Sequence, residues 1–395
     1  MTPAADTASA VRAFVSRPRP LPLEGAVRHN EWGGREFIPG LLGRANPDGR
    51  PFAELWMGAH PRAPAAALVD GISVGLDALV AAAPVEVLGE SDARRFGGRL
   101  PYLLKVLDAR SMLSLQAHPS LAQARAGFAR ENEAGIPPDA PTRCYGDDNH
   151  KPEVHAALTE FWMLHGFRPL SEIADTLEAV PELSRLSPGF RTLLRRAGSD
   201  PGAGRSLLRA LFGALMALPQ PEVDRMIDPL VRRLERGPQE DRDRHGYWAL
   251  QAARTHPLPD GHRDRGVAAI FLLNLVHLHP GEGTFQPAGT LHAYLEGATV
   301  ELMTSSDNVL RGGLTRKHVD AQELLRTLTF DSGLPPVLDG RRVSDTERVY
   351  EAPVGEFLLS CIEPRPGASH AETRDHGPDC LVVLAGAARA VTAED

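Results

Sequence analysis

From Leu21 onward the chain consists of short runs in which hydrophobic and polar residues alternate, and glycine or proline separates one run from the next. Alternation with a period of two is typical of half-buried β-strands. It predicts strands or strand-edge turns at residues 29–34, 52–58, 103–107, 112–118, 151–158 and 161–167. Two intervening segments, 75–88 and 121–133, have the spacing of helices.

The pattern changes between residues 169 and about 266, where leucine, alanine and arginine recur at helical spacing through 171–180, 191–195, 206–217 and 223–236. Strand-like runs resume at 267–278 and continue to Glu301, followed by a helix at 319–329 and further strands at 355–362 and 380–384. The fold class predicted from this order is mainly β, with an α-helical insertion.

Two of the predicted strands carry polar residues on a face that is hydrophobic and packs on the core in most half-buried strands. Ser114, Gln116 and His118 share one face of their strand, and Lys151 and Glu153 share a face of another, with hydrophobic residues behind both rows. Such a pattern is typical of strands that line a wet cavity while their other face packs on protein. The alternative for either stretch alone is a surface strand with its polar face in solvent.

A third stretch, residues 279–292, fits the pattern G-x5-P-x-G-x2-H, with Gly281, Pro287, Gly289 and His292 in the fixed positions. The glycines and proline form tight corners between short antiparallel strands, and the histidine then points inward. The stretch resembles the second motif of the cupin superfamily, small β-barrels that hold a metal inside. That motif usually continues to an asparagine, where this chain has Glu296.

The polar positions of the three stretches form a candidate metal site made of Gln116, His118, Glu153 and His292. Two imidazoles, a carboxylate and an amide oxygen make a mixed nitrogen and oxygen set, which suits zinc and its borderline neighbours. We expect one Zn²⁺ per chain. A histidine by itself is more often structural, but four such residues on polar strand faces favour a shared ion.

Composition narrows the possible partners and the compartment. The net charge of −8 and a pI near 6.0 argue against nucleic acid or an anionic membrane as the main partner. The longest apolar run, 267–278, is too short to span a bilayer. Three cysteines without a CxxC pair predict free thiols and a reducing, cytoplasmic location. Residues 1–20 lack the apolar core of a secretory signal, so we expect a disordered extension.

Lysine is scarce in this chain. Only Lys105, Lys151 and Lys317 occur among 43 basic residues. Lysines that persist in an arginine-rich background are candidates for tasks that need a compact charge or a shiftable pKa. With the hydroxyl of Ser114, they are predicted to form a local positive pocket for substrate, although ordinary surface charge is the alternative.

At this point a more specific resemblance is evident. Blocks at 52–61, 113–119, 149–153 and 300–315 resemble, in this order, the motifs of the type I mannose-6-phosphate isomerases. The resemblance implies cupin-type barrels (jelly rolls) from Leu21 to the C-terminus. Residues 21–168 and 267–330 would form a catalytic barrel interrupted by a helical domain at 169–266. Residues 331–395 would start a second barrel, which we expect to be incomplete at Asp395.

The resemblance also implies a function. Zinc-dependent isomerisation would interconvert mannose 6-phosphate and fructose 6-phosphate through a cis-enediol, in mannose metabolism and GDP-mannose synthesis. The partner would be a small sugar phosphate, and the enzyme a cytoplasmic monomer. The family's zinc ligands fall on the four residues named above, and its catalytic arginine falls on Arg311. The residue that moves the proton is left open among Lys151, Tyr294 and Glu301.

Three other functions are alternatives to this one. A related cupin isomerase of another aldose or aldose phosphate is the alternative within the class. A cupin oxidoreductase using iron and dioxygen would need a histidine-rich ligand set, and Gln116 together with the lysines argues against it. A sugar-binding cupin without catalysis is less compatible with Arg311 beside all four ligands.

Overall fold

The central element of the fold is a ten-stranded antiparallel sheet in the described part of the chain. The computed structural model describes residues 4–238, 241–368, 370–371 and 377–390. Six strands form the main path of the sheet, in the order β10 (Leu273–Leu278), β9 (Phe161–Phe167), β12 (His292–Thr304), β6 (Tyr102–Ala109), β3 (Glu54–Gly58) and β2 (Ala26–Arg28). Four more lie off this path, namely β7 (Leu115–Ala117), β8 (Glu153–Ala157), β11 (Gly283–Gln286) and β13 (Leu310–Gly313).

Strand β12 joins the two halves of this sheet. Its first residues pair with β9 and β7, whereas its later residues pair with β6 and β8. A register shift between Tyr294 and Glu296 interrupts the pairing with β9 just before the pairing with β6 starts at Gly297, as a β-bulge does when a strand bends. Because one strand crosses both halves, residues from distant parts of the chain meet along it.

The sheets are antiparallel, in agreement with the predicted class of fold, but strand pairing does not close any of the described sheets into a barrel. Most predicted strands of the sheet are present with shorter or shifted ends. Strand β9 has the predicted bounds, and only residues 115–117 of the predicted strand 112–118 form β7. Of 29–34, the structure has isolated bridges at Gly33 and Gly34.

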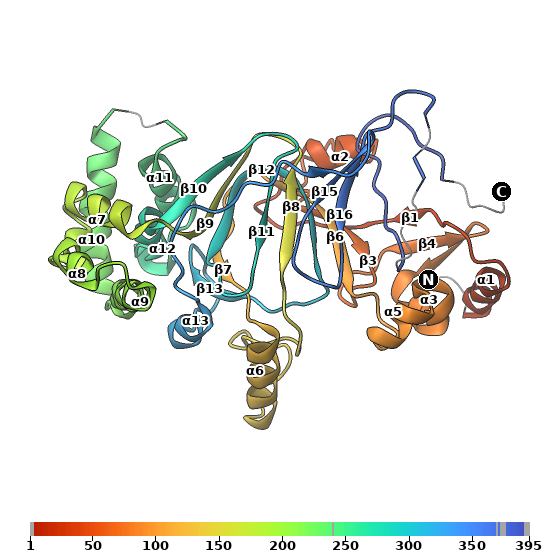
Figure 1. Cartoon of the computed structure of the whole chain (residues 1–395), viewed down its shortest axis with the longest axis horizontal. Coiled ribbons are helices and arrows are strands. Elements are labelled where there is room, and N and C mark those ends of the chain that lie inside the picture. The colour runs from red at the N-terminus through yellow and green to blue at the C-terminus, as the bar shows by residue number, and fades with distance from the viewer. Residues whose placement is uncertain (1–3, 239–240, 369, 372–376, 391–395) are drawn as a thin grey trace.

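Helices occupy the segment between β9 and β10. They are α7 (Leu170–Ala179), α8 (Phe190–Ala197), α9 (Pro201–Ala217), α10 (Gln220–Arg236) and α11 (His245–Thr255). They gather at one end of the molecule, beside β9 and β10 (Figure 1). Their buried residues, among them Phe212, Ile227 and Trp248, belong to the same core as Trp162 and Phe167 of β9.

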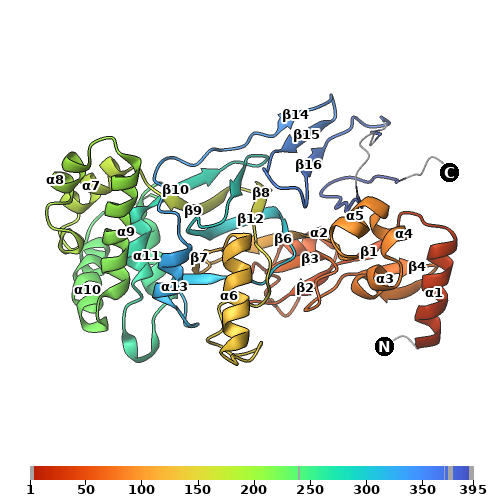
Figure 2. The same cartoon turned by 60° about the horizontal axis from the view of Figure 1, so that its bottom comes forward.

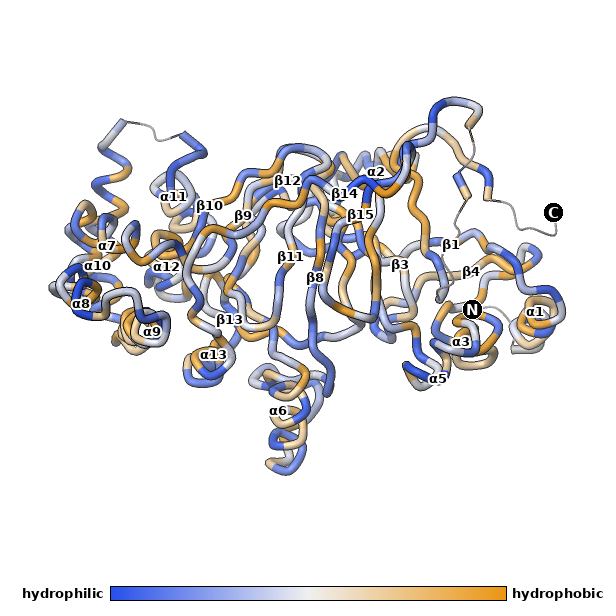
Figure 3. Tube along the Cα trace, in the orientation of Figure 1, coloured by the Kyte–Doolittle hydropathy of each residue, from blue (hydrophilic) through white to orange (hydrophobic). Residues whose placement is uncertain are grey.

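The strand predicted over 267–278 is wrong in its first half. Residues 266–272 form α12 (Gly266–Ala269) and a 3-10 turn (Ile270–Leu272), and β10 starts at Leu273. All residues from Gly266 to Asn274 are buried, and the region around α12 and β9 is predominantly hydrophobic in Figure 3. A continuous apolar run has no periodicity, so it does not distinguish a buried helix from a buried strand.

The expectation of a disordered N-terminal extension is also wrong from residue 4 onward; residues 1–3 lie outside the described residues. Helix α1 (Ala4–Ser16) buries Ala10 and Phe14, which are four residues apart on one face. They pack on a small sheet of β1 (Leu23–Glu24), β4 (Ala66–Val69) and β5 (Ile72–Gly75). The alanine-rich composition favours a helix, and this apolar face stabilises it against the domain.

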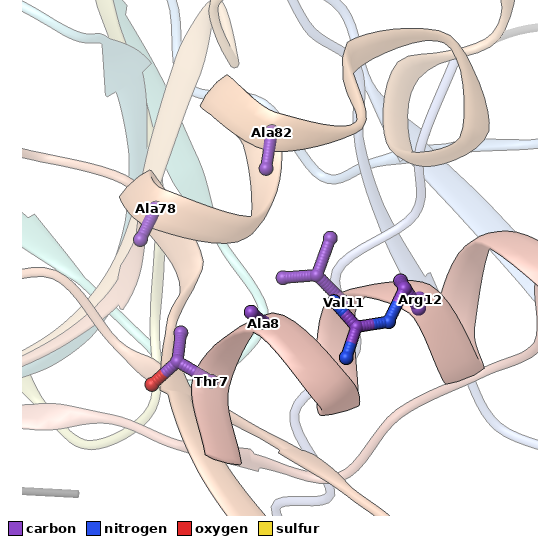
Figure 4. Close-up of a pocket in the computed structure, with 6 residues that line it drawn as sticks. All are labelled: Thr7, Ala8, Val11, Arg12, Ala78 and Ala82. Atoms are coloured by element: carbon purple, nitrogen blue, oxygen red, sulfur yellow. The ribbon is translucent and has the colours of Figure 1, made fainter. Parts of the chain in front are cut away.

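Helices α3 (Leu76–Ala82), α4 (Pro84–Leu88) and α5 (Glu90–Arg95) complete this N-terminal cluster, where a single helix was predicted over 75–88. The cluster lies at the end of the large sheet opposite α7–α11 (Figure 2). A shallow groove between α1 and α3 is lined by mostly small side chains (Figure 4), namely Thr7, Ala8, Val11, Arg12, Ala78 and Ala82.

Three further helices follow strands of the large sheet. Helices α2 (Phe37–Leu41) and α6 (Leu121–Glu133) follow β2 and β7, and α13 (Ala321–Thr327) follows β13. Helix α6 has the predicted bounds because Ser120 and Gln123 form a capping box at its start. The predicted helix 319–329 corresponds to α13 with shorter ends.

The C-terminal part contains a small antiparallel sheet of β14 (Arg341–Arg342), β15 (Glu347–Tyr350) and β16 (Leu359–Ile362). The Tyr350 hydroxyl donates to the carbonyl of Gly281 at 2.6 Å, which ties this sheet to the turn before β11. The strand predicted at 380–384 is wrong, because no strand is assigned there. Cys380 and Val382 instead pack as loop residues against the core.

The three cysteines are free thiols, as predicted. In the described part of the chain, none of the helices is both long and apolar enough to cross a membrane.

Candidate metal centre and active site

Three predicted metal ligands, His118, Glu153 and His292, meet inside the large sheet. One possible ligand atom from each lies within 4.8 Å of the others, and at most 2% of any of these residues is exposed. His118 Nε2 lies 3.4 Å from Glu153 Oε1, and His292 Nε2 lies 3.6 Å from Glu153 Oε2. Glu153 starts β8, His292 starts β12, and His118 directly follows β7, so the antiparallel pairing of these strands assembles the cluster.

The backbone orients both imidazoles. The Nδ1 of His118 lies 2.7 Å from the carbonyl oxygen of Asn308, and the Nδ1 of His292 lies 3.0 Å from that of Thr290. A carbonyl only accepts, so Nδ1 carries the proton and Nε2 keeps its lone pair. Both Nε2 atoms are buried without a hydrogen-bond partner. Two orphaned lone pairs beside a carboxylate fit a zinc ion, and backbone contacts of this kind commonly hold histidine ligands.

Charge at the cluster suits a cation. Burial, with a further contribution from His118, lowers the pKa of His292 to about 3, so the imidazole is neutral, as a metal ligand must be. Burial alone would raise the pKa of Glu153, but Lys151 and the two histidines hold it well below its usual range. Lys151 Nζ lies 3.1 Å from Glu153 Oε1.

Gln116, the fourth predicted ligand, lies beside the other three. It is opposite His292 in the pairing of β7 with β12, and opposite Arg311 in the pairing of β7 with β13. The expected division of faces is confirmed here, because the flanking Leu115 and Ala117 are fully buried in the core while Gln116 is partly exposed.

A second buried group runs along β12 beside the metal cluster. The ammonium of Lys105 donates to Glu301 Oε1 at 2.9 Å, and the Tyr294 hydroxyl donates to Glu301 Oε2 at 2.6 Å. The Gln286 amide donates to the Tyr294 hydroxyl at 2.8 Å. Glu54 Oε1 lies 3.9 Å from Lys105 Nζ.

The pKa values in this group follow from its burial and charges. Burial alone would lower the pKa of Lys105, but Glu301, Glu54 and Glu153 raise it above its usual value. Burial and the nearby Glu301 raise the pKa of Tyr294 well above 10. The structure therefore pairs Lys105 with carboxylates and does not leave it free for a substrate phosphate, which was its predicted role.

The other predicted cations lie at the more open side of the site. Arg311, on β13, is half-buried, and its guanidinium has no hydrogen-bonding partner among the described residues. Burial lowers the pKa of Lys317, and the positive charges of Arg311 and Arg62 lower it further, so both cations act on Lys317. Ser114 is partly buried two residues before Gln116. Closely spaced cations with few partners can bind an anion.

Sequence reasoning missed several residues of the site. Arg62 contacts Asp307 at 3.1 Å, and His60 lies 3.5 Å from the same carboxylate. The Asn308 side chain holds the loop before β8 through bonds with Gly146 and Asp147, while its carbonyl orients His118. His60, Asp307 and Asn308 lie inside the recognised sequence blocks, which was the signal that could have found them.

Comparison with known proteins places these features in a family context. Residues 21–170 match the family described as phosphomannose isomerase type I, catalytic domain. The mannose-6-phosphate isomerase of Salmonella typhimurium is 37% identical over 353 residues, covering 86% of this chain and 82% of that protein. The mannose-6-phosphate isomerase 1 of Arabidopsis thaliana is 34% identical, covering 94% and 85%.

Solved structures agree with these sequence matches. A zinc-bound crystal structure of mannose 6-phosphate isomerase superposes with a TM-score of 0.74 at 35% identity, covering 86% of this chain and 82% of that chain. A mutant phosphomannose isomerase from Salmonella typhimurium gives a TM-score of 0.75 at 34% identity, with the same coverage.

Proposed function

The chain belongs to the type I phosphomannose isomerases, and from this premise we propose how its own residues carry out the reaction. The protein is a zinc-dependent mannose-6-phosphate isomerase, which interconverts mannose 6-phosphate and fructose 6-phosphate. The single observation that carries the proposed mechanism is the pair of buried, unpartnered Nε2 atoms that face one carboxylate beside a cluster of cations.

We assign zinc to His118 Nε2, His292 Nε2, the Glu153 carboxylate and the Gln116 amide oxygen. This donor set suits zinc, and the backbone bonds at both Nδ1 atoms hold the two rings in place. When bound, zinc supplies Lewis-acid polarisation of the substrate carbonyl, which acidifies the proton on the adjacent carbon.

We assign the transfer of the proton between C2 and C1 to Glu301. Tyr294 is a poor base because its pKa is raised and it already donates its proton to Glu301. Lys151 is paired with a proposed metal ligand, with its Nζ 3.1 Å from Glu153 Oε1, so its ammonium is already engaged. Glu301 is the remaining candidate, and Lys105 and Tyr294 each donate a hydrogen bond to one of its carboxylate oxygens and so fix its orientation.

The cations divide into two roles. Lys151, beside the metal cluster, stabilises the negative charge that develops on the substrate oxygens as the proton leaves C2. Arg311, Lys317 and the Ser114 hydroxyl bind the phosphate at the open side of the site, with Arg62 as a further positive charge. A locally positive electrostatic potential is necessary at the phosphate because the net charge of the chain is −8 and repels an anionic substrate.

We further propose the domain plan that the sequence suggested. The catalytic cupin domain would comprise 21–168 and 267–330, with 169–266 as a helical insertion and 331–395 as part of a second cupin-type domain. The helical segment supplies no member of the His118, Glu153 and His292 cluster, which supports the plan. We also propose a cytoplasmic monomer in mannose metabolism and GDP-mannose synthesis, and the free thiols are compatible with a reducing compartment.

A coupled assay tests this proposal. Zinc-loaded protein should convert mannose 6-phosphate to fructose 6-phosphate, lose activity with a strong chelator, and regain it when zinc is restored. His118→Ala should remove activity, whereas His29→Ala, a control at the partly buried His29–Pro51 contact, should not. Turnover that persists without metal, or in His118→Ala, would overturn the ligand assignment.

The assignment of the base has its own test. Glu301→Gln should lower kcat by about 10²–10⁴-fold with a small change in KM, since general-base catalysis contributes that much. Tyr294→Phe should have a smaller effect, because it removes only one positioning hydrogen bond. A Glu301→Gln enzyme within tenfold of wild type, together with an inactive Lys151→Met enzyme, would assign the base to Lys151.

A further inference from the structure

A second group of metal-ligating side chains lies on the surface, apart from the catalytic cluster. In the described ranges, only His118, Glu153 and His292 and the group Glu160, His277 and His279 place three potential ligand atoms within 4.8 Å of one another. Glu160 and His279 are exposed and His277 is partly exposed. The group plays no part in the proposed mechanism.

Strand pairing builds this group. Strands β9 and β10 are antiparallel, with Leu278 opposite Phe161 and His277 opposite Trp162. Continuing that register places His279 opposite Glu160. His277 and His279 are two residues apart and therefore share a face of the strand. Neighbouring side chains on one face of an antiparallel pair are close enough to interact.

The contacts within the group show which atoms converge. His277 Nε2 lies 2.5 Å from Glu160 Oε2, and His279 Nδ1 lies 3.1 Å from the same oxygen. Trp162 stacks on the His277 ring, with centroids 3.8 Å apart and an angle of 6° between the planes. The stacking fixes one ligand, while the exposed Glu160 side chain is free to adjust.

We propose that Glu160, His277 and His279 form a second binding site for a divalent transition metal, with zinc as the best-suited ion. Two imidazoles and a carboxylate are a common zinc donor set, and the exposed position leaves room for water as a fourth ligand. Two ligands at about 2.1 Å in a tetrahedral arrangement lie about 3.4 Å apart. The contact between Glu160 and His277 must therefore lengthen by about 0.9 Å, a small rotation for an exposed carboxylate.

This site is separate from the catalytic cluster. His165, five residues along the chain from Glu160, is the residue of β9 that pairs with His292. Five extended residues span about 17 Å. A metal bound here would tie the turn before β9 to the end of β10, and we expect it to raise thermal stability without taking part in turnover. The inference does not rest on the proposed function.

Zinc titration of the full-length protein tests the proposal. In His118→Ala, which lacks a catalytic ligand, one zinc should still bind in competition with a chromophoric chelator of micromolar affinity, and it should raise the thermal midpoint. Adding His279→Ala should weaken this binding at least tenfold. The matched control is His262→Ala, which removes an exposed histidine paired with a single carboxylate of Asp224 at 2.7 Å.

Wild-type protein provides a second measurement if His118→Ala fails to fold. Wild-type protein that retains its first zinc ion should take up a second, exchangeable zinc ion per chain. His279→Ala should lose only this second zinc ion and keep isomerase activity. The absence of a second equivalent at high micromolar zinc would overturn the proposal, as would unchanged uptake in His279→Ala. Loss of activity in His279→Ala would contradict the separation of the two sites.

Discussion

The buried pair of Lys105 and Glu301 gives the sharpest prediction about the architecture of the site. Their charged atoms lie 2.9 Å apart, and the exposed fractions of the side chains are 6% and 3%. At an effective dielectric constant of 20, two unit charges at this distance attract each other by about 6 kcal/mol. Much of this attraction is offset by the cost of removing both charges from water.

Lys105→Met should therefore destabilise the protein by about 3–5 kcal/mol, because it leaves the Glu301 carboxylate buried without its partner. The double variant Lys105→Met with Glu301→Gln should recover part of this loss, since it removes both charges. Arg94→Met is a matched control, because Arg94 and Glu90 form an ion pair of 2.8 Å on the surface with side chains 74% and 79% exposed. The control should change stability little.

Urea unfolding of the zinc-saturated variants, followed by tryptophan fluorescence, measures these differences. The Lys105 ammonium lies 5.3 Å from the centre of the Trp56 ring, so the probe is local. The loss of stability in Lys105→Met should be smaller at low pH than at pH 8, because a neutral, protonated carboxyl costs less to bury without a cationic partner than a carboxylate does.

Two results would refute this reasoning. A Lys105→Met protein as stable as wild type at pH 8 would show that the charge on Glu301 does not depend on Lys105. A double variant whose loss of stability equals the sum of the losses in the two single variants would show that the two side chains act independently. Either result would also remove the basis for treating Lys105 as the residue that positions Glu301.

Three further predictions concern substrate binding, a helix cap and pH. Lys317→Met should raise KM for mannose 6-phosphate about ten- to 150-fold, because it removes one charge-assisted hydrogen bond to the phosphate. Activity on unphosphorylated mannose should stay unchanged, and equal effects on both sugars would contradict the prediction. Ser120→Ala should cost about 1 kcal/mol of stability through the α6 cap without changing KM, and an altered KM would contradict a purely structural role. Burial lowers the pKa of His245 to about 4, so the free energy of unfolding should fall as pH drops below 6.5, where the unfolded chain takes up a proton and the folded chain does not. His245→Gln should reduce the slope of unfolding free energy against pH in this range by about 1.4 kcal/mol per pH unit. An unchanged slope would contradict the prediction.

The parts of the site that sequence reasoning found are those with a local pattern. A period of two predicts Ser114, Gln116 and His118 on one face, and the structure leaves Ser114 and Gln116 partly exposed while it buries Leu115 and Ala117. The bounds of the helix at 121–133 and the glycine and proline corners before His292 are likewise encoded within a few residues. Such signals depend on the backbone geometry of one element, so they can be detected without the fold.

The parts that sequence reasoning missed depend on contacts between distant segments. Lys105 was expected near phosphate, but it meets Glu301, which is 196 residues away, through the pairing of β6 with β12. Arg62 and Asp307 meet across a similar separation in sequence. Helix α1 was missed for the same reason, because its stability depends on the packing of Ala10 and Phe14 on a sheet that the composition of residues 1–20 does not reveal.

The central claim is that zinc binds between Gln116, His118, Glu153 and His292. An anomalous difference map at the zinc edge, from crystals of protein purified without chelator, tests it most directly. We predict that the strongest peak lies about 2.0–2.2 Å from both Nε2 atoms, from a carboxylate oxygen of Glu153 and from the amide oxygen of Gln116. No peak between these four side chains, or a strongest peak bound to other residues, would contradict it.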